Sequence, residues 1–262
     1  MILLCLCLLA FLLPGPARAG AWTQEEGRWQ VISGVILSDG DRSYDSNLPI
    51  QFRRTLLQAF SEYGLTAETT LFATAESAAV DIRQGSAPRF HASDNAIEGG
   101  ARWRFDPWAG LSALGVFSLD VSARAAGAFN FAVSADRSTG GSSTQARLLY
   151  GRGFKLWDRD AFVDLEAGGR LLSGARPLEL PLDLTAGVWL DPDDMAMVQS
   201  FNLSASAGHT AAYPAFTSHK LQFSWVRRLS DRFLVQAGAF FSPAGHNALV
   251  EQGACLSLWS RF

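Results

Sequence analysis

Charged side chains recur at every second position inside segments that are otherwise apolar. In residues 161–172, Asp164, Glu166 and Arg170 would share one face, while the other face carries only alanine, valine, leucine and glycine. Successive side chains of a β-strand point to opposite faces, so these charges would lie together on a face in contact with water. Charges arranged in this way either line a polar path for solutes or pair with one another and brace an interior.

The same alternation in other segments sends a set of polar and charged side chains toward one interior. This set consists of Glu98, Arg102, Arg104, Arg147, Asp164, Glu166, Arg170, Glu179, Asp183, Lys220, Gln222 and Arg228. We predict that these residues line the lumen of a β-barrel. Both interpretations stay open and are compatible with each other: a pathway whose electric field selects solutes, and an interior braced by ion pairs.

A second arrangement has the spacing of hydrolytic chemistry. His91, Ser93 and Asn95 follow one another at alternate positions, and outer-membrane phospholipases use a His-x-Ser pair in which an asparagine orients the histidine. We expect this segment to lie in an outer loop rather than on a strand at the membrane rim, so we favour a solvated polar loop. No two histidines share the spacing of metal ligands. The sequence therefore predicts no catalytic residue, no metal site and no cofactor.

Period-two alternation recurs along the chain, whereas helical periodicity is hard to find. The sequence predicts an all-β fold, an up-and-down antiparallel transmembrane barrel of about twelve strands. The predicted strands are residues 28–38, 52–63, 68–80, 96–106, 109–119, 144–154, 161–172, 179–190, 195–206, 218–229, 232–242 and 250–262. An exported barrel of the lipocalin type is the nearest alternative, but its core would have to bury the inward charges.

Connections alternate between tight turns, such as residues 106–108, and longer stretches, such as residues 120–143. In bacterial barrels the short turns lie on the periplasmic side, and both termini would then lie there as well. About twelve strands fall between the filled interior of eight and the aqueous channel of 16–18, so we expect a narrow pore. The apolar stretch 126–133 should either fold into the lumen or extend two strands as a hairpin.

The first residues have the features of an export signal. Residues 2–13 form an apolar run that is shorter than the roughly 20 residues of a transmembrane helix. A Pro-Gly-Pro break follows, and Ala17 and Ala19 then supply the small residues that a signal peptidase reads. We predict a signal peptide over residues 1–19 and an outer-membrane barrel over residues 20–262. A membrane anchor that stays attached is the alternative.

The last strand ends in an aromatic residue, Phe262, on the same face as Leu256 and Leu258. A terminal aromatic that closes a period-two strand resembles the C-terminal signature of bacterial outer-membrane barrels. The resemblance implies that the outer-membrane insertion machinery reads this strand, and we assign Trp259 and Phe262 to the assembly signal. The strand should also pair with residues 28–38, because an open sheet edge in lipid leaves backbone groups unsatisfied.

Aromatic residues gather near the predicted tight turns. They are Tyr63, Phe105, Trp108, Phe154, Trp157, Trp189, Phe233, Trp259 and Phe262. Aromatic rings prefer the membrane interface, so this bunching favours an aromatic girdle over a soluble β-core filled by the same rings.

Short motifs at the start of the mature chain (Gly20 to Gln24), at the turn from Glu62 to Thr66 and in the strand from Phe162 to Glu166 add to the terminal Phe262. Together they resemble a group of bacterial outer-membrane barrels similar to the proteins tied to phenol-degradation pathways. The resemblance implies an outer-membrane location in a Gram-negative bacterium and a transport role. It supplies no catalytic or binding residues.

Composition agrees with an exported membrane barrel. The hydrophobic fraction is 48% and the net charge is −3, a near balance that argues against a nucleic-acid partner. Cys5 and Cys7 lie in the predicted signal, so Cys255 has no partner for a disulfide. We predict passive or gated passage of small solutes, with outer-membrane lipid and the insertion machinery as partners. A plugged structural or adhesive barrel and a lipid-modifying enzyme are the alternatives.

Overall fold

The computed structural model describes residues 20–45, 49–86, 88–106, 114–126, 142–174, 176–208 and 213–262. The predicted signal peptide over residues 1–19, Trp108 and most of the predicted loop 120–143 lie outside these residues, and their structures stay predictions.

Regular structure in the described residues consists of twelve β-strands. They are β1 (Trp29–Ser43), β2 (Ile50–Gly64), β3 (Thr69–Gln84), β4 (Phe90–Phe105), β5 (Val116–Ala126), β6 (Ser143–Leu156), β7 (Arg159–Leu172), β8 (Glu179–Trp189), β9 (Asp194–Ala205), β10 (Phe216–Arg228), β11 (Phe233–His246) and β12 (Leu249–Arg261). Within this part of the chain, no helix is long and apolar enough to cross a membrane.

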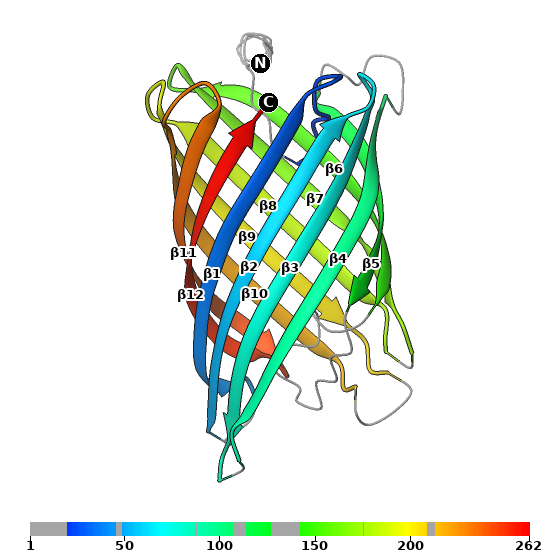
Figure 1. Ribbon diagram of the computed structural model, residues 1–262, viewed down its shortest axis with the longest axis vertical. Coiled ribbons are helices and arrows are strands. Elements are labelled where there is room, and N and C mark those ends of the chain that lie inside the picture. Colours follow the sequence, from blue (N-terminus) through cyan, green and yellow to red (C-terminus); the bar gives the residue numbers. More distant parts are fainter. Residues whose placement is uncertain are drawn as a thin grey trace, which may run out of the picture.

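Every strand pairs antiparallel with its neighbours in sequence, and β1 pairs with β12 to close the sheet (Figure 1). This arrangement confirms the predicted up-and-down antiparallel barrel, its strand number and its closure by the first and last strands. Closure satisfies the backbone hydrogen bonds of every strand, which a lipid environment requires.

The predicted alternation separates an apolar outer face from a polar inner face. On β7, Leu165 and Leu171 are exposed on the outer face, whereas Asp164 is buried within the barrel. Large apolar side chains such as Leu57 on β2 and Leu148 on β6 are likewise exposed on the wall. An apolar outer wall of this kind suits contact with lipid chains.

The start of β1 and the C-terminal residue lie at the same end of the barrel (Figure 1). The connection between β8 and β9 at this end is a tight turn organised by Asp191, whose carboxylate accepts hydrogen bonds from the backbone N–H groups of Asp193 and Asp194, each 2.8 Å long. These bonds favour the ionised form and hold the pKa of Asp191 below its usual value. Short turns mark the periplasmic end in bacterial barrels.

The predicted fifth strand was wrong in position. We predicted residues 109–119 after a tight turn at 106–108, but β4 ends at Phe105 and β5 begins only at Val116. The sequence of residues 109–115 contains only apolar or small residues and one serine, so it lacks the alternation of polar and apolar residues that such a strand needs. The observed strand instead presents a polar inner face, made by Ser118, Asp120, Ser122 and Arg124, which form hydrogen bonds or ion pairs inside the barrel.

The C-terminal residue extends the closing ladder. The backbone N–H of Phe262 donates to the carbonyl of Trp29 (2.9 Å), and the N–H of Trp29 donates back to Phe262 (3.0 Å). The Phe262 ring itself is exposed on the outer face. The ring therefore adds little to the interior, while the backbone of the residue completes closure.

We expect the Phe262→Ala variant to refold almost normally into detergent but to reach the membrane of cells at low yield. The change keeps both backbone hydrogen bonds and removes one ring, worth no more than about 3 kcal/mol even if the ring were fully buried. Yield in purified outer membranes and heat-modifiable gel migration of refolded protein measure the two effects. Normal membrane yield in cells would contradict the assembly role of Phe262.

Candidate functional site

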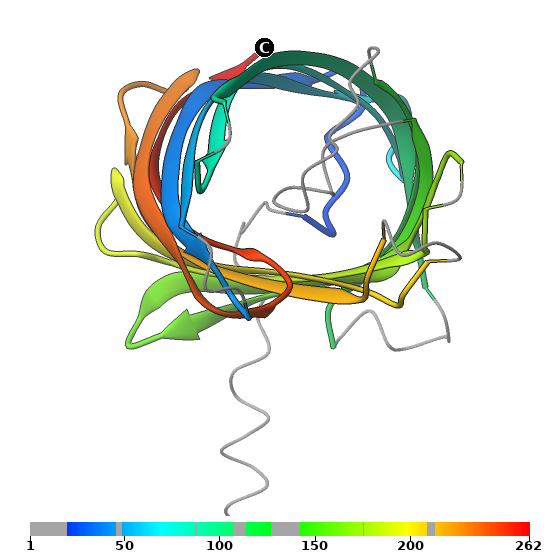
Figure 2. The ribbon, with the colours of Figure 1, turned by 90° about the horizontal axis from the view of Figure 1, so that it is seen from below.

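The segment from Gly20 to Gln24 lies inside the barrel rather than outside it. Seen along the barrel axis, the dark blue start of the described chain crosses the interior of the ring (Figure 2). Ala21 has no exposed surface at all. A segment that precedes β1 therefore fills part of the lumen near the periplasmic end, and we call it the N-terminal plug.

Hydrogen bonds from several strands hold the backbone of the plug. The N–H of Ala21 donates to Asp164 on β7 (2.7 Å), and the hydroxyl of Ser118 on β5 donates to the Ala21 carbonyl (2.5 Å). The N–H of Gln24 donates to the hydroxyl of Thr70 on β3 (2.8 Å). Buried backbone groups need such partners, so the polar inner wall fixes the path of the plug.

The ring of Trp22 anchors the plug by packing. It contacts Phe162 edge-on, with ring centroids 6.4 Å apart and planes at 88°. A Cβ atom on Gly151 would overlap the indole, so glycine at this position makes room for the ring. Phe162 belongs to a buried apolar cluster with Met195, Met197, Val226 and Leu234. The plug is therefore held by packing against this apolar cluster as well as by hydrogen bonds to polar groups.

Arg102 joins the plug to the wall. Its guanidinium binds Asp120 through two N–H groups (2.9 and 3.2 Å) and Glu62 through a third (2.8 Å). The nitrogen that binds Glu62 also donates to the Trp22 carbonyl (3.2 Å). Gln24 of the plug donates to the second oxygen of Glu62 (2.8 Å). Bidentate guanidinium–carboxylate pairs are geometrically specific, so this cluster orients both wall and plug.

A second cation organises the adjacent acidic strands. Arg147 on β6 contacts Glu166 on β7 (3.0 Å) and Asp183 on β8 (2.7 Å) through one nitrogen. The backbone N–H of Asn202 on β9 also donates to Asp183 (3.3 Å). These contacts run side by side across four consecutive strands and brace the wall, as one of the two interpretations of the charged set expected.

Ion pairs continue toward the far end of the lumen. Glu251 on β12 contacts Arg54 on β2 (3.2 Å) and Lys220 on β10. Further pairs join Glu76 to Arg124 (2.7 Å) and Arg170 to Glu179 (3.1 Å). Beyond them, the inner wall becomes apolar through Ile50, Phe52, Val80, Ile82 and Leu249, which pack together.

The remaining predicted lumen residues have separate contacts. Glu98 accepts a hydrogen bond from Ser122 (2.6 Å), and Gln222 donates to Gln199 (3.0 Å). Arg228 lies over the ring of Trp189, 4.9 Å from its centroid. Arg104 occupies the inward register of β4, and its backbone N–H donates to the carbonyl of Glu68 (2.8 Å).

Several residues of the site escaped the sequence prediction. They are the N-terminal plug itself and the wall residues Arg54, Glu62, Glu76, Asp120, Arg124 and Glu251. The alternation of β2 and β12, extended over the whole strands, would have found Glu62 and Glu251. Nothing in a five-residue segment without a period predicts that it enters the lumen.

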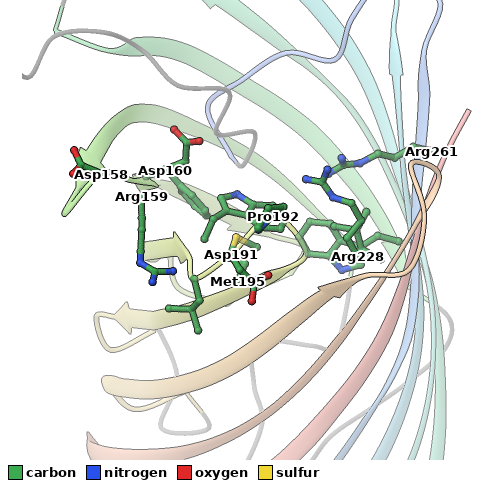
Figure 3. Close-up of a pocket in the computed structure, with 13 residues that line it drawn as sticks. Asp158, Arg159, Asp160, Asp191, Pro192, Met195, Arg228 and Arg261 are labelled. Atoms are coloured by element: carbon green, nitrogen blue, oxygen red, sulfur yellow. The ribbon is translucent and has the colours of Figure 1, made fainter.

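A cavity of about 650 Å³ opens at the periplasmic end next to the plug (Figure 3). Its lining includes Met195, Trp189 and Trp259, together with Arg228 and Arg261. In the close-up, both arginines lie on the same side of this cavity. Trp189 and Trp259 were predicted in the interfacial girdle, and this was wrong: both pack against the buried cluster inside the barrel, because they occupy inward positions of β8 and β12.

The His91 segment also differs from its prediction. His91 and Ser93 belong to β4 rather than to a loop, because β4 extends to Phe90. His91 is exposed, and its Nδ1 atom lies 3.4 Å from Asp81 on β3. In the described ranges, no group of three or more histidine, cysteine, aspartate or glutamate residues could hold a metal ion.

No family model matches the sequence, and no curated protein matches it. Solved structures do match the fold. An outer-membrane channel from Pseudomonas putida F1 aligns with a TM-score of 0.63 at 11% identity, over 95% of this chain and 100% of that chain.

Two translocating barrels of autotransporters are also similar. The transport unit of AIDA-I from Escherichia coli has a TM-score of 0.54 at 7% identity and covers 96% of this chain and 95% of its own. The translocator domain of NalP from Neisseria meningitidis has a TM-score of 0.51 at 16% identity, with coverages of 91% and 90%. Identities this low show a shared fold. The closed sheet and the apolar outer wall agree with this fold, which is that of transmembrane β-barrels.

Proposed function

We propose that the protein is a gated channel that passes small polar solutes across the outer membrane. The observation that supports the proposal is that a short segment outside the barrel sheet, and not a strand of the wall, obstructs the lumen. The N-terminal plug fills part of the lumen near the periplasmic end, and it is a segment outside the barrel sheet that can leave without breaking any strand pairing.

The space around the plug supports a polar pathway. A cavity of about 280 Å³ is lined on one side by Gly20 and Trp22 of the plug and on the other by Glu62, Arg102 and Glu166 of the wall. A water molecule occupies about 30 Å³ of liquid volume, so this cavity has room for several. A gap beside the plug that is lined by charged side chains suits ions and small hydrophilic solutes.

The charges around the plug favour cations over anions. The carboxylates are Glu62, Asp120, Asp164, Glu166 and Asp183, and the guanidiniums among them are Arg102 and Arg147. An excess of one sign in a narrow polar pore raises the local concentration of the opposite sign. We therefore expect cation preference in the conducting state.

A plugged barrel with a structural or adhesive role is the second candidate. It is favoured by the number of lumen charges that already contact an opposite charge, since such pairs brace the wall without any solute. A lipid-modifying enzyme has weaker support: His91 lies next to Asp81 on the outer face, but the pair is exposed to solvent. The resemblance to outer-membrane proteins of phenol-degradation pathways also supports transport, without naming the solute.

Swelling of proteoliposomes in solutions of single solutes tests the proposal. We expect entry that falls steeply with solute size, and faster entry of arginine than of glutamate, which have similar sizes and opposite charges. Protein-free liposomes and liposomes with heat-denatured protein are the controls. Entry no faster than in protein-free liposomes, from protein that shows heat-modifiable folding, would favour the plugged barrel.

A further inference from the structure

Asp164 is the buried carboxylate of the plug site that lacks a cation. It is 2% exposed, and the N–H of Ala21 donates to its Oδ2 atom at 2.7 Å. Within the described ranges, no arginine, lysine or histidine side chain forms an ion pair with it. A buried carboxylate is costly unless a cation or several donors compensate its charge.

The guanidiniums of the two neighbouring clusters already have carboxylate partners. Arg102 contacts Glu62 and Asp120, and Arg147 contacts Glu166 and Asp183. Each cation therefore has two carboxylates, whereas Asp164 has no cation partner among the described residues. The site has a deficit of positive charge next to the plug.

Gly20 begins the described chain directly against this carboxylate. A Cβ atom placed on Gly20 would overlap the side chain of Asp164. The backbone nitrogen of Gly20 is bonded to the same Cα at about 1.5 Å, the length of a Cα–Cβ bond. When Gly20 is the first residue, rotation about its Cα–C bond turns that nitrogen toward the carboxylate, and a shift of the Asp164 side chain by less than about 1 Å gives hydrogen-bond distance instead of overlap.

We propose that proteolytic maturation creates the missing cation: Asp164 binds the N-terminal ammonium of Gly20 inside the lumen and locks the plug. Water hydrolyses the bond between Ala19 and Gly20, the new carboxylate leaves with residues 1–19, and the amine stays on Gly20. An α-amino group is mostly protonated at pH 7. The ammonium then adds a charge-assisted contact to the hydrogen bond that Asp164 already accepts from Ala21.

The lock has a consequence for the order of events in biogenesis. An unprocessed chain has an uncharged amide at Gly20 and no ammonium for Asp164. Removal of the signal therefore adds a charge that strengthens the seating of the plug, which the contacts of Ala21, Trp22 and Gln24 already hold in the lumen. The expected change in conductance rests on the proposed function as a gated channel. The expected change in the thermal unfolding midpoint does not depend on conduction.

A charge-removal cycle on the mature, refolded chain tests the proposal. Selective transamination converts the Gly20 amine into a carbonyl, which removes the charge at nearly constant size, and Asp164→Asn removes its partner. We expect transamination to lower the thermal unfolding midpoint by several degrees and to raise channel conductance several-fold. In the Asp164→Asn variant, the same modification should change neither quantity further.

The matched control is a chain that begins at Glu25, in which transamination of the terminal amine should have no effect on the midpoint. Mass spectrometry of protein from cells should give Gly20 as the first residue. Equal effects of transamination with and without the Asp164→Asn substitution, or a different mature N-terminus, would overturn the proposal. A midpoint shift that depends on Asp164 in a barrel that never conducts would retain the lock and reject the gate.

Discussion

Deletion of residues 20–24 is expected to raise single-channel conductance several-fold while the barrel stays folded. The deletion removes Trp22 and Ala21, which fill the lumen, but leaves all twelve strands and the closing pair β1–β12 intact. The wall residues Asp164, Ser118 and Thr70, which now bind plug groups, would face water and be solvated. Conductance in planar bilayers measures the effect.

Folding of the deletion variant is checked separately. Heat-modifiable gel migration and circular dichroism should match those of the full mature chain. A graded control is Trp22→Ala, which keeps the plug backbone and its hydrogen bonds but removes the anchoring ring that packs on Phe162. We expect an intermediate conductance with frequent transitions. Unchanged conductance in the deletion variant would show that the obstruction lies elsewhere in the lumen.

Arg102→Ala is expected to be the most destabilising single substitution in the lumen. Arg102 is 6% exposed and contacts two buried carboxylates, Glu62 and Asp120. Removing one partner of a buried ion pair leaves uncompensated charge and costs about 3–5 kcal/mol. Equilibrium unfolding in urea, followed by tryptophan fluorescence in lipid vesicles, measures the loss.

Two variants separate the charge cluster from general effects of losing an arginine. Arg228→Ala removes a cation that packs on Trp189 and, among the described residues, has no carboxylate at ion-pair distance. Its expected cost is about 0.5–1 kcal/mol, as for a partly exposed cation–π contact. Arg102→Lys keeps the charge but not the bidentate geometry and should give an intermediate value. Similar losses for Arg102→Ala and Arg228→Ala would contradict the role assigned to the cluster.

Period-two alternation was sufficient to predict most of the wall. On β7 and β8, the segregation of Asp164, Glu166 and Asp183 from leucines and valines matches the observed inner and outer faces. A strand between water and lipid must have polar and apolar side chains at alternate positions, so this pattern can be recognised in the sequence. The position of β5 was predicted wrongly because the apolar run before this strand hides the residue at which the alternation starts.

The plug was beyond sequence reasoning for a different reason. Its contacts, such as Ala21 with Asp164 and Trp22 with Phe162, join residues more than a hundred positions apart. They depend on the assembled barrel, in which β3, β5 and β7 all present side chains to the same part of the lumen. Pairing partners of the charges were likewise unpredictable, because alternation assigns a face to each side chain but does not say which neighbour on that face it contacts.

The most direct test of the account is the ion selectivity of the folded protein in a planar bilayer under a salt gradient. We predict small, well-defined conductance steps with a reversal potential of the sign for cation preference, and larger steps after deletion of residues 20–24. Absence of steps above background from both proteins, each shown to be folded by heat-modifiable migration, would contradict a conducting lumen and leave the structural barrel as the function.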